Sequence, residues 1–326
     1  MSVLLVVSNN IGDGKTSFCT ALACKARDEG KTSLAFKPFL STDDLDNKHF
    51  INLLGQKEKS EFDIKSSNGD KGQLEDLEKY LIDQDKPNHL LIVEIDSNVS
   101  NSDVATIAEK VGAGVIAVAR YGPELKTEDI SGFSKEFGDS FRGAIINGVT
   151  KYQNHTLNSK IIPSLSSLGI EPICMVPEDR LLLSVTTGDI VEHLDGQVYS
   201  GGEWLDTLVE KFVIGSFGLD SGENYLDVDA RKAVLVRGDR PDVQMAVLQT
   251  PTVCMILTKG VDPIEYVKYE AMEQEVPIII VESDTISTMQ RLDTIQDYSK
   301  FNHADKLDRF IQLVDDSIDL SALCGV

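Results

Sequence analysis

The sequence predicts an α/β protein with two domains, a first domain built on a parallel sheet and a second, smaller α/β domain. The chain has 326 residues, which is more than one small domain usually holds. Short apolar runs without alternation are separated by stretches of helical pattern, as is typical of parallel strands covered by helices on both faces. A smaller alternation of the same kind resumes after Tyr199-Ser200-Gly201-Gly202. We therefore expect a first domain at 1–180, a second at 181–300 and a C-terminal helical tail at 301–326.

In the first domain six apolar runs alternate with helical patterns. The strands are expected at 3–8, 33–36, 89–95, 115–119, 143–147 and 173–176, and the helices at 15–29, 74–84, 103–111, 128–137 and 154–168. In the second domain strands are expected at 233–236, 253–257 and 277–281, and helices at 242–248, 264–273 and 287–293. In the tail, apolar residues at helical spacing predict a helix at 304–314.

The composition excludes several classes of partner. Lys and Arg number 31 against 53 Asp and Glu, so the formal charge is −22. Such an acidic surface argues against nucleic acid and against anionic membranes. No run of about 18 apolar residues predicts a membrane span. The first residues have no basic segment, and the five cysteines are scattered and odd in number. These features favour a cytoplasmic protein with reduced thiols.

A glycine-containing loop between the first strand and the first helix is the sharpest signal. Gly12 and Gly14 allow the backbone to turn its N–H groups toward a phosphate, and the following helix directs its positive end to the same place. Lys15 can reach the β- and γ-phosphates, and Thr16 offers a hydroxyl to Mg²⁺. The first glycine of the usual pattern is replaced by Asn9. The alternative is a plain strand-to-helix turn. The predicted nucleotide contacts in the loop are Asn10, Gly12, Asp13, Gly14, Lys15, Thr16 and Ser17.

This loop resembles the variant phosphate loop of dethiobiotin synthetases, a P-loop group that also holds cobyrinic acid amidases. The segment Ala35-Phe36-Lys37-Pro38-Phe39 resembles the same group. The resemblance implies a P-loop NTPase-like domain with ATP and Mg²⁺ as cofactors, and it implies catalytic roles for Lys15 and Lys37. The alternative for Lys37 is a solvated lysine at a strand end.

Carboxylates near two strand ends are candidates for holding Mg²⁺. Glu94 ends an apolar strand, where ligands of parallel sheets collect, and Asp96 follows it. The resemblance further implies a second carboxylate among Asp43, Asp44 and Asp46, of which Asp44 is selected, although these residues equally suit a solvated acidic loop. The predicted metal ligands are Thr16, Glu94 and Asp44, since Mg²⁺ prefers carboxylate and phosphate oxygens. The glycines that follow the glutamate in the family are absent here.

Three residues farther along match the family's base-binding positions. Asn147 ends a strand and has the donor and acceptor that a purine edge requires, although a turn-forming asparagine is the alternative. Pro177 and Glu178 follow the last strand of the domain, where the family's backbone approaches the base.

The second domain resembles the DRTGG domain. The resemblance lies in the segments 184–190, Gly238-Asp239-Arg240, 257–260 and Ser283-Asp284-Thr285, with Lys259 where the family has glycine. It implies a possible site for a small anion near Arg240, although helix capping by the same residues is an equal alternative. It also implies a homodimer. Both domains together resemble the N-terminal portion of long phosphate acetyltransferases, without their catalytic domain.

Two functions follow as hypotheses. The first is a sensor or regulatory subunit that binds Mg-ATP and is linked to acetyl-phosphate or acetyl-CoA metabolism; it is favoured by the missing glycines after Glu94. The second is an ATP-dependent C–N ligase of the dethiobiotin synthetase or cobyrinic acid amidase type, favoured by the intact Gly14-Lys15-Thr16 and by Lys37. A nucleotide-hydrolysing switch protein is a weaker third.

Overall fold

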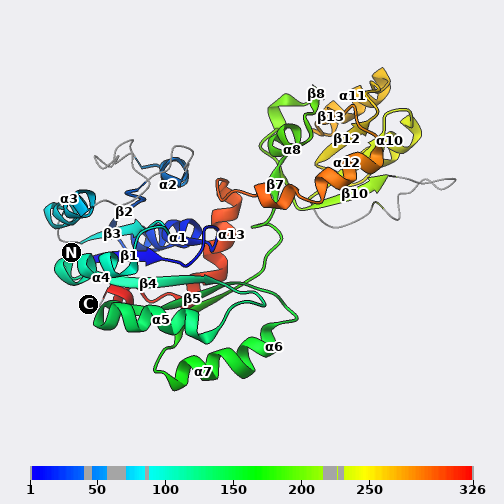
Figure 1. Ribbon diagram of the computed structural model, residues 1–326. Helices are drawn as coiled ribbons and strands as arrows, with labels where there is room; N and C mark the ends of the chain where they lie inside the picture. The colour runs from blue at the N-terminus through cyan, green and yellow to red at the C-terminus, as the bar shows by residue number, and fades with distance from the viewer. Residues whose placement is uncertain are drawn as a thin grey trace. The chain divides into compact units, whose positions relative to one another are not determined.

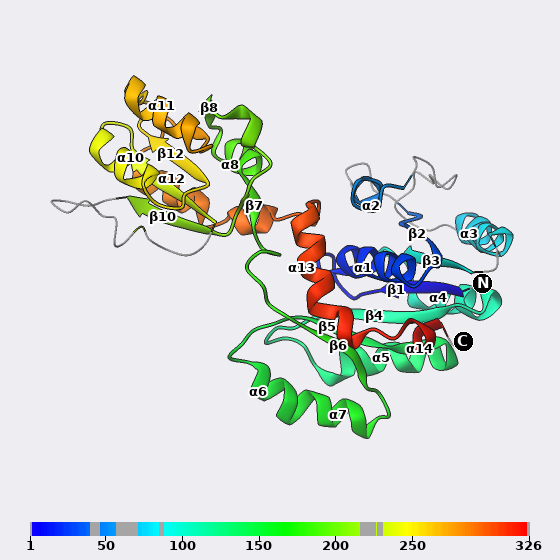
Figure 2. The same cartoon turned by 180° about the vertical axis from the view of Figure 1, so that it is seen from behind.

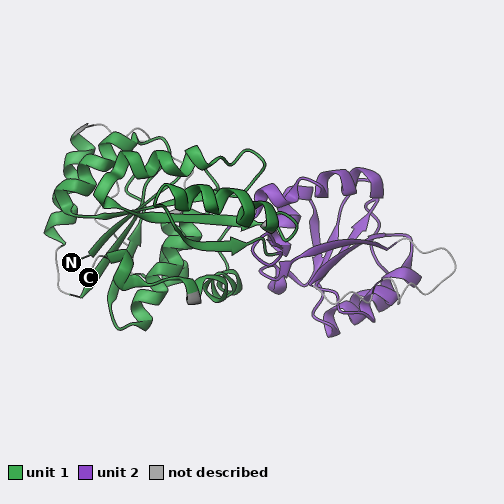
Figure 3. Cartoon of the chain, turned by 90° about the horizontal axis from the view of Figure 1, so that it is seen from below, with its two compact units in different colours: residues 1–179, 301–326 green, residues 180–300 purple. Residues whose placement is uncertain are grey.

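The computed structural model describes residues 2–39, 46–56, 71–84, 88–215, 226 and 231–324. The chain forms two compact units, coloured separately in Figure 3. Unit 1 holds 1–179 together with 301–326, and unit 2 holds 180–300. The C-terminal residues, which the sequence analysis separated as a tail, thus belong to unit 1. Within the described residues, no helix has both the length and the apolar character needed to cross a membrane.

Unit 1 contains a six-stranded parallel sheet, as the sequence predicts. The strand order is β2-β3-β1-β4-β5-β6, so the first strand lies in the middle of the sheet (Figure 1). Because the strands are parallel, their carboxyl ends all lie at one edge. The strands are β1 (Ser2–Val7), β2 (Thr32–Phe36), β3 (His89–Glu94), β4 (Gly114–Arg120), β5 (Phe141–Val149) and β6 (Pro172–Pro177).

Helices cover both faces of this sheet. One face packs against α3, α4, α5 and α7, whose buried apolar side chains join alternate residues of β1 such as Val3, Leu5 and Val7 in one core. The bounds are α1 (Lys15–Asp28), α2 (Asp46–Leu54), α3 (Lys71–Asp83), α4 (Asn101–Val111), α5 (Thr127–Phe137), η1 (Gly138–Ser140), α6 (Asn154–Thr156), α7 (Ile162–Ser167), α13 (Ala304–Val314), η5 (Asp315–Ser317) and α14 (Leu320–Cys324). The helix expected at 154–168 is present but includes a π-helical turn, η2 (Leu157–Ile161).

The C-terminal helices belong to unit 1 because their apolar sides are buried there. α13 packs against α1 and β6, and α14 packs against β1 (Figure 2). Phe310 and Val314 on α13 are buried. Polar contacts fix the same packing. Lys25 Nζ lies 2.9 Å from Asp315 Oδ1, and the Arg309 guanidinium lies 2.8 Å from Asp179 Oδ2. The tail is therefore a structural layer of unit 1.

Unit 2 contains a five-stranded sheet in the order β10-β11-β12-β13-β8, in which β8 is antiparallel to its neighbour. Two apolar cores lie on opposite faces of this sheet. The elements are β7 (Val185–Thr186), α8 (Thr187–Leu194), β8 (Gln197–Ser200), η3 (Gly202–Trp204), β9 (Leu208–Val209), β10 (Lys211–Gly215), β11 (Lys232–Arg237), α10 (Pro241–Leu248), β12 (Cys254–Thr258), α11 (Glu265–Glu273), β13 (Ile278–Ile280), α12 (Thr285–Leu292) and η4 (Ile295–Tyr298). The short strands β7 to β10 and helix α8 are additions to the elements predicted from sequence.

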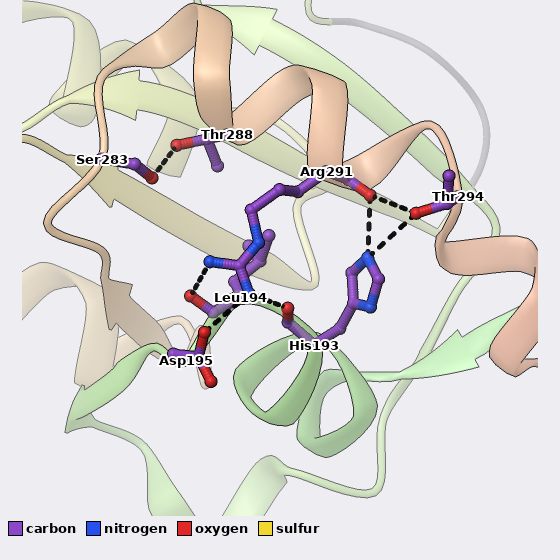
Figure 4. Close-up of polar contacts among 7 residues, drawn as sticks. All are labelled: His193, Leu194, Asp195, Ser283, Thr288, Arg291 and Thr294. Atoms are coloured by element: carbon purple, nitrogen blue, oxygen red, sulfur yellow. Dashed lines mark hydrogen bonds and ion pairs between the residues drawn. The ribbon is translucent and has the colours of Figure 1, made fainter.

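A reciprocal pair of contacts joins the ends of α8 and α12, and we name it the His193–Arg291 clasp (Figure 4). The Arg291 guanidinium donates to the main-chain oxygens of His193 and Leu194, and it forms an ion pair with Asp195 at 2.8 Å. In return, His193 Nε2 lies 2.7 Å from the Arg291 carbonyl oxygen. Each side chain thus caps the carboxyl end of the other helix, where main-chain carbonyls lack helical partners. His193 is accordingly a structural residue.

Candidate functional site

The predicted phosphate loop connects β1 to α1 at the carboxyl edge of the sheet. β1 lies between β3 and β4, so the loop lies between the segments that leave those two strands. Gly12 has φ +85° and Gly14 has φ +102°, conformations that L-residues with a Cβ rarely adopt. α1 begins at Lys15 without a side-chain cap and without an acidic residue in its first turn. The helix therefore presents uncapped N–H groups and its positive end to this edge of the sheet.

Lys15 is held inside the loop. Its side chain is buried, and its Nζ donates to Ser8 Oγ at 2.7 Å. The same hydroxyl donates to the Asn10 carbonyl oxygen at 2.7 Å. Thr16 and Ser17 follow in the first turn of α1 and are partly buried. The loop thus encloses the Lys15 side chain, and Ser8, which was not among the residues predicted from sequence, holds its amino group in place.

Asn147 braces the loop from β5. Its Nδ2 donates to the Asp13 carbonyl oxygen at 2.9 Å. A Cβ placed on Gly14 would lie 2.2 Å from the same nitrogen, so only glycine leaves room for this contact. One amide hydrogen of Asn147 is therefore used by the loop, while its Oδ1 remains an acceptor. This contact was not expected from sequence, and it ties a strand end to a residue 134 positions earlier.

Asp13 is a buried carboxylate within the loop, with 4% of its surface exposed. Its Oδ2 accepts a hydrogen bond from the Asn10 main-chain N–H at 3.1 Å. Burial raises the pKa of Asp13 above its usual value, and this effect exceeds the opposing hydrogen bonds from Asn10 and the attraction of Lys15 and Arg120. The loop therefore contains a buried titratable carboxyl group of its own.

Lys37 and the carboxylates after β3 lie along the same sheet edge. Lys37 directly follows β2 and is buried, and its Nζ lies 3.4 Å from Asp96 Oδ2. The Asn47 side chain on α2 fixes the main chain of Lys37, accepting from its N–H at 2.8 Å and donating to its carbonyl oxygen at 3.0 Å. Glu94 ends β3 beside Val6 of β1 and is 3% exposed. The structure therefore gives Lys37 a defined position rather than a solvated one.

The sequence also predicts site residues among the acidic residues in 43–46 and at Pro177 and Glu178. Asp43 and Asp44 lie outside the described residues, and Asp46 is the first residue of α2. Pro177 ends β6, and the exposed Glu178 follows it, donating its main-chain N–H to the Val149 carbonyl oxygen at 2.9 Å. β6 pairs with β5, so these residues lie one strand beyond Asn147.

The chemistry of the described donors suits Mg²⁺ better than a transition metal. In the described part of the chain, no three or more His, Cys, Asp or Glu side chains gather in a way that would hold a metal ion. Thr16 supplies a hydroxyl and Glu94 a carboxylate, and phosphate oxygens and waters commonly complete the shell of Mg²⁺. These residues fit a metal that is bound together with a nucleotide.

In unit 2 the cationic side chains at the ends of β11 and β12 are matched by carboxylates. Arg240 binds Asp242 through two hydrogen bonds, of 2.9 and 2.8 Å, and Arg237 binds Asp239 in the same way. The hydrogen bond from Arg237, and to a smaller extent attraction to Lys259, lowers the pKa of Asp239. An anion at this edge would compete with carboxylates that are already in place. These carboxylates pair with the arginines and do not cap α10, which begins without a side-chain cap.

Asp284, by contrast, caps a helix of this unit. It accepts from the main-chain N–H groups of Ile286 and Ser287 at 2.9 and 3.0 Å, at the start of α12. Thr258, which ends β12, and Thr285, which begins α12, share a hydrogen bond of 3.2 Å. Gln244, fully buried on α10, donates to the carbonyl oxygens of Arg237 and Gly238. These bonds hold the turns of the edge in place.

Comparison with known proteins supports the assignment of the second unit. Residues 189–295 match the DRTGG domain, so unit 2 carries a DRTGG domain. A phosphate acetyltransferase from Nitratidesulfovibrio vulgaris is 26% identical over 239 residues, which are 67% of this chain and 33% of that protein. The chain spans a third or less of the length of the curated phosphate acetyltransferases it matches.

Two solved structures are similar in parts. The MinD septum site-determining protein of Pyrococcus horikoshii, complexed with Mg-ADP, aligns with 56% of this chain and 83% of its own at a TM-score of 0.39 and 15% identity. The CBS and DRTGG domains of Clostridium perfringens pyrophosphatase, complexed with diadenosine tetraphosphate, align with 38% of this chain and 55% of their own at a TM-score of 0.32 and 15% identity. The sheet order and the loop before α1 give unit 1 a P-loop NTPase-like fold.

Proposed function

We propose that unit 1 binds Mg-ATP at the loop 8–17 and that the chain is a nucleotide-responsive regulatory protein with the DRTGG domain as its regulatory module. The observation that carries the proposal is the preformed loop. Lys15 is already held by Ser8, and Asn147 fixes the main chain of Asp13 beside a glycine that no other residue can replace. A strand-to-helix turn without a ligand needs neither a buried lysine nor an uncapped helix start.

Magnesium would be held by Thr16 and Glu94 together with phosphate oxygens. When bound, the ion neutralises phosphate charge, which matters in a chain with a net charge of −22. Asp44 is retained as a candidate ligand from sequence. Asn147 Oδ1, Pro177 and Glu178 are proposed to contact the base. An exocyclic amino group suits the Asn147 acceptor, because the amide nitrogen already serves the loop.

The metabolic context is taken from the relatives. Because the matched relatives are phosphate acetyltransferases, we place the chain in acetyl-phosphate or acetyl-CoA metabolism as a sensor or regulatory subunit. A cytoplasmic location and a homodimer belong to the same proposal. A small anionic ligand at the DRTGG domain belongs to it too, and it would have to displace Asp239 or Asp242 from the arginines that they now bind.

One observation favours a second candidate, an ATP-dependent C–N ligase that phosphorylates a carboxylate or carbamate. Lys37 is buried, is fixed by Asn47, and lies at the same sheet edge as Lys15. A lysine at this position can stabilise negative charge that develops on a transferred phosphoryl group. Lys15 and Lys37 would then be the catalytic residues.

Calorimetric titration of Mg-ATP tests the binding proposal. Lys15→Ala should weaken binding by about 1.5–3 kcal/mol, the usual loss for a hydrogen bond to a charged group. Lys135→Ala, which removes an exposed lysine on α5, is the matched control and should bind as the wild type does. Equal affinity of Lys15→Ala and wild type, or no binding by either, would overturn the proposal. ADP release that requires an added amine or carboxylate would select the ligase, and binding with little turnover would select the sensor.

A further inference from the structure

Asp13 differs from the other groups of the phosphate loop because it brings a negative charge into it. The carboxylate has 4% of its surface exposed, and its Oδ2 accepts from the Asn10 main-chain N–H at 3.1 Å. The main chain of the same residue accepts from Asn147 Nδ2 at 2.9 Å. Both the side chain and the backbone of Asp13 are therefore held, so the carboxylate cannot easily turn out to solvent.

The groups that act on this carboxylate come from the loop itself and from two neighbouring elements. Asn10 of the loop donates hydrogen bonds to it, and Lys15 at the start of α1 and Arg120 at the end of β4 attract it. Burial outweighs these favourable contacts and raises the pKa of Asp13. Lys15, the cation that a phosphate would use, is thus partly balanced by a resident carboxylate before any nucleotide arrives.

We propose that Asp13 is an internal anion of the phosphate loop that weakens nucleotide binding, and that the loop takes up a proton at this carboxyl group when a nucleotide binds. The inference rests on the proposed binding of Mg-ATP and deepens it by naming how that binding is tuned. Phosphate oxygens are like charges to the carboxylate, and like charges that share a buried site favour protonation of one partner. Binding and protonation at Asp13 therefore promote one another.

The direction of the pH dependence follows. A nearby polyanion raises the pKa of Asp13 further, so the bound form holds the proton up to a higher pH than the free form. Affinity then falls as pH rises between the two pKa values and levels off above the higher one. Mg-ATP has its own titration in the same range, so the comparison must be made against a variant without the carboxylate.

Asp13→Asn is the sharp test, because asparagine keeps an oxygen that can accept from the Asn10 N–H while the charge is removed. Titration of Mg-ATP at pH 5.5–8.5, in two buffers of different ionisation enthalpy, gives affinity and proton uptake together. We expect Asp13→Asn to bind about tenfold more tightly at pH 8, which corresponds to a pKa shift of about one unit on binding. We also expect it to lose the proton uptake seen in the wild type. Asp28→Asn, which removes an exposed carboxylate at the far end of α1, is the matched control.

The outcomes separate this inference from the binding proposal. If Lys15→Ala weakens binding while Asp13→Asn keeps both the affinity and the proton uptake of the wild type, the loop binds nucleotide, but Asp13 only holds the loop backbone and does not tune the binding. If Lys15→Ala and the wild type bind alike, the binding proposal itself is wrong. Far-UV circular dichroism checks folding, and Asp13→Ser, which is also an uncharged acceptor, replaces Asp13→Asn if that variant does not fold.

Discussion

Gly14→Ala probes the contact between the loop and β5 most directly. An added Cβ would lie 2.2 Å from Asn147 Nδ2, far closer than a carbon and a nitrogen can approach, and the residue would be forced to keep φ +102°. The backbone strain costs about 1–2 kcal/mol. Displacing Asn147 forfeits its hydrogen bond to Asp13 O, which costs about another 1 kcal/mol. We expect unit 1 to lose roughly 2–3 kcal/mol of unfolding free energy.

A double-mutant cycle measures how far the effects of Gly14→Ala and Asn147→Ala on the unfolding free energy depend on each other. Asn147→Ala alone should lower the unfolding free energy by about 1 kcal/mol, because it removes the hydrogen bond to the Asp13 carbonyl oxygen but creates no clash with residue 14. In the double variant Gly14→Ala/Asn147→Ala the clash is absent and the hydrogen bond is lost once rather than twice. The double variant should therefore be more stable than the sum of the single effects by about 1 kcal/mol, a size typical of contacting residues.

Equilibrium urea unfolding of the full chain is the assay. Far-UV circular dichroism follows both units, whereas fluorescence of Trp204, the single tryptophan, follows unit 2. The variants should change the dichroism curve and leave the Trp204 curve in place. Additivity of the two single substitutions within about 0.3–0.5 kcal/mol would refute the proposed contact.

Three further predictions concern the rest of the chain. Arg291→Ala removes the side chain that caps α8 in the His193–Arg291 clasp. The urea midpoint followed by Trp204 fluorescence should therefore fall by more than it does for Arg142→Ala, the control in unit 1. An equal fall for both variants would contradict a capping role. Arg240 holds the pKa of Asp242 at about 2 rather than 3.8, so the stabilisation from this carboxylate is present above about pH 4 and is lost as pH falls toward 2. Unfolding midpoints of Asp242→Asn across that range should show a smaller pH dependence than those of the wild type. Burial raises the pKa of Cys174 to about 11 and that of Cys254 still further, so mass spectrometry after iodoacetamide treatment at pH 8 should show both unmodified in the native protein and alkylated in about 6 M guanidinium.

The sequence predicts the sheet of unit 1 well because each strand is a short apolar run with a clear boundary. All six expected strands are present, with ends that differ by at most two residues. The phosphate loop follows from local chemistry too, since its glycines and lysine lie within four residues of one another. Local pattern is sufficient where an element depends on its own residues.

Contacts between distant segments could not be predicted. No local signal links Asn147 to Asp13, and the serine that positions Lys15 looks like an ordinary strand-end residue. β7 and β9 have two residues each, too few for a periodic pattern, and they are paired only through the fold of unit 2. The packing of α13 on α1 likewise depends on surfaces almost 280 residues apart along the chain.

The placement of α13 and α14 has a consequence for synthesis on the ribosome. The chain emerges from its N-terminus, so the strands of unit 1 and the phosphate loop appear first. They lack one covering layer until residues 301–326 have been made, after the whole of unit 2. Phe310 and Val314 complete that layer. Unit 1 therefore begins first in the sequence but is completed only after unit 2, and until then the apolar face that α13 covers is exposed.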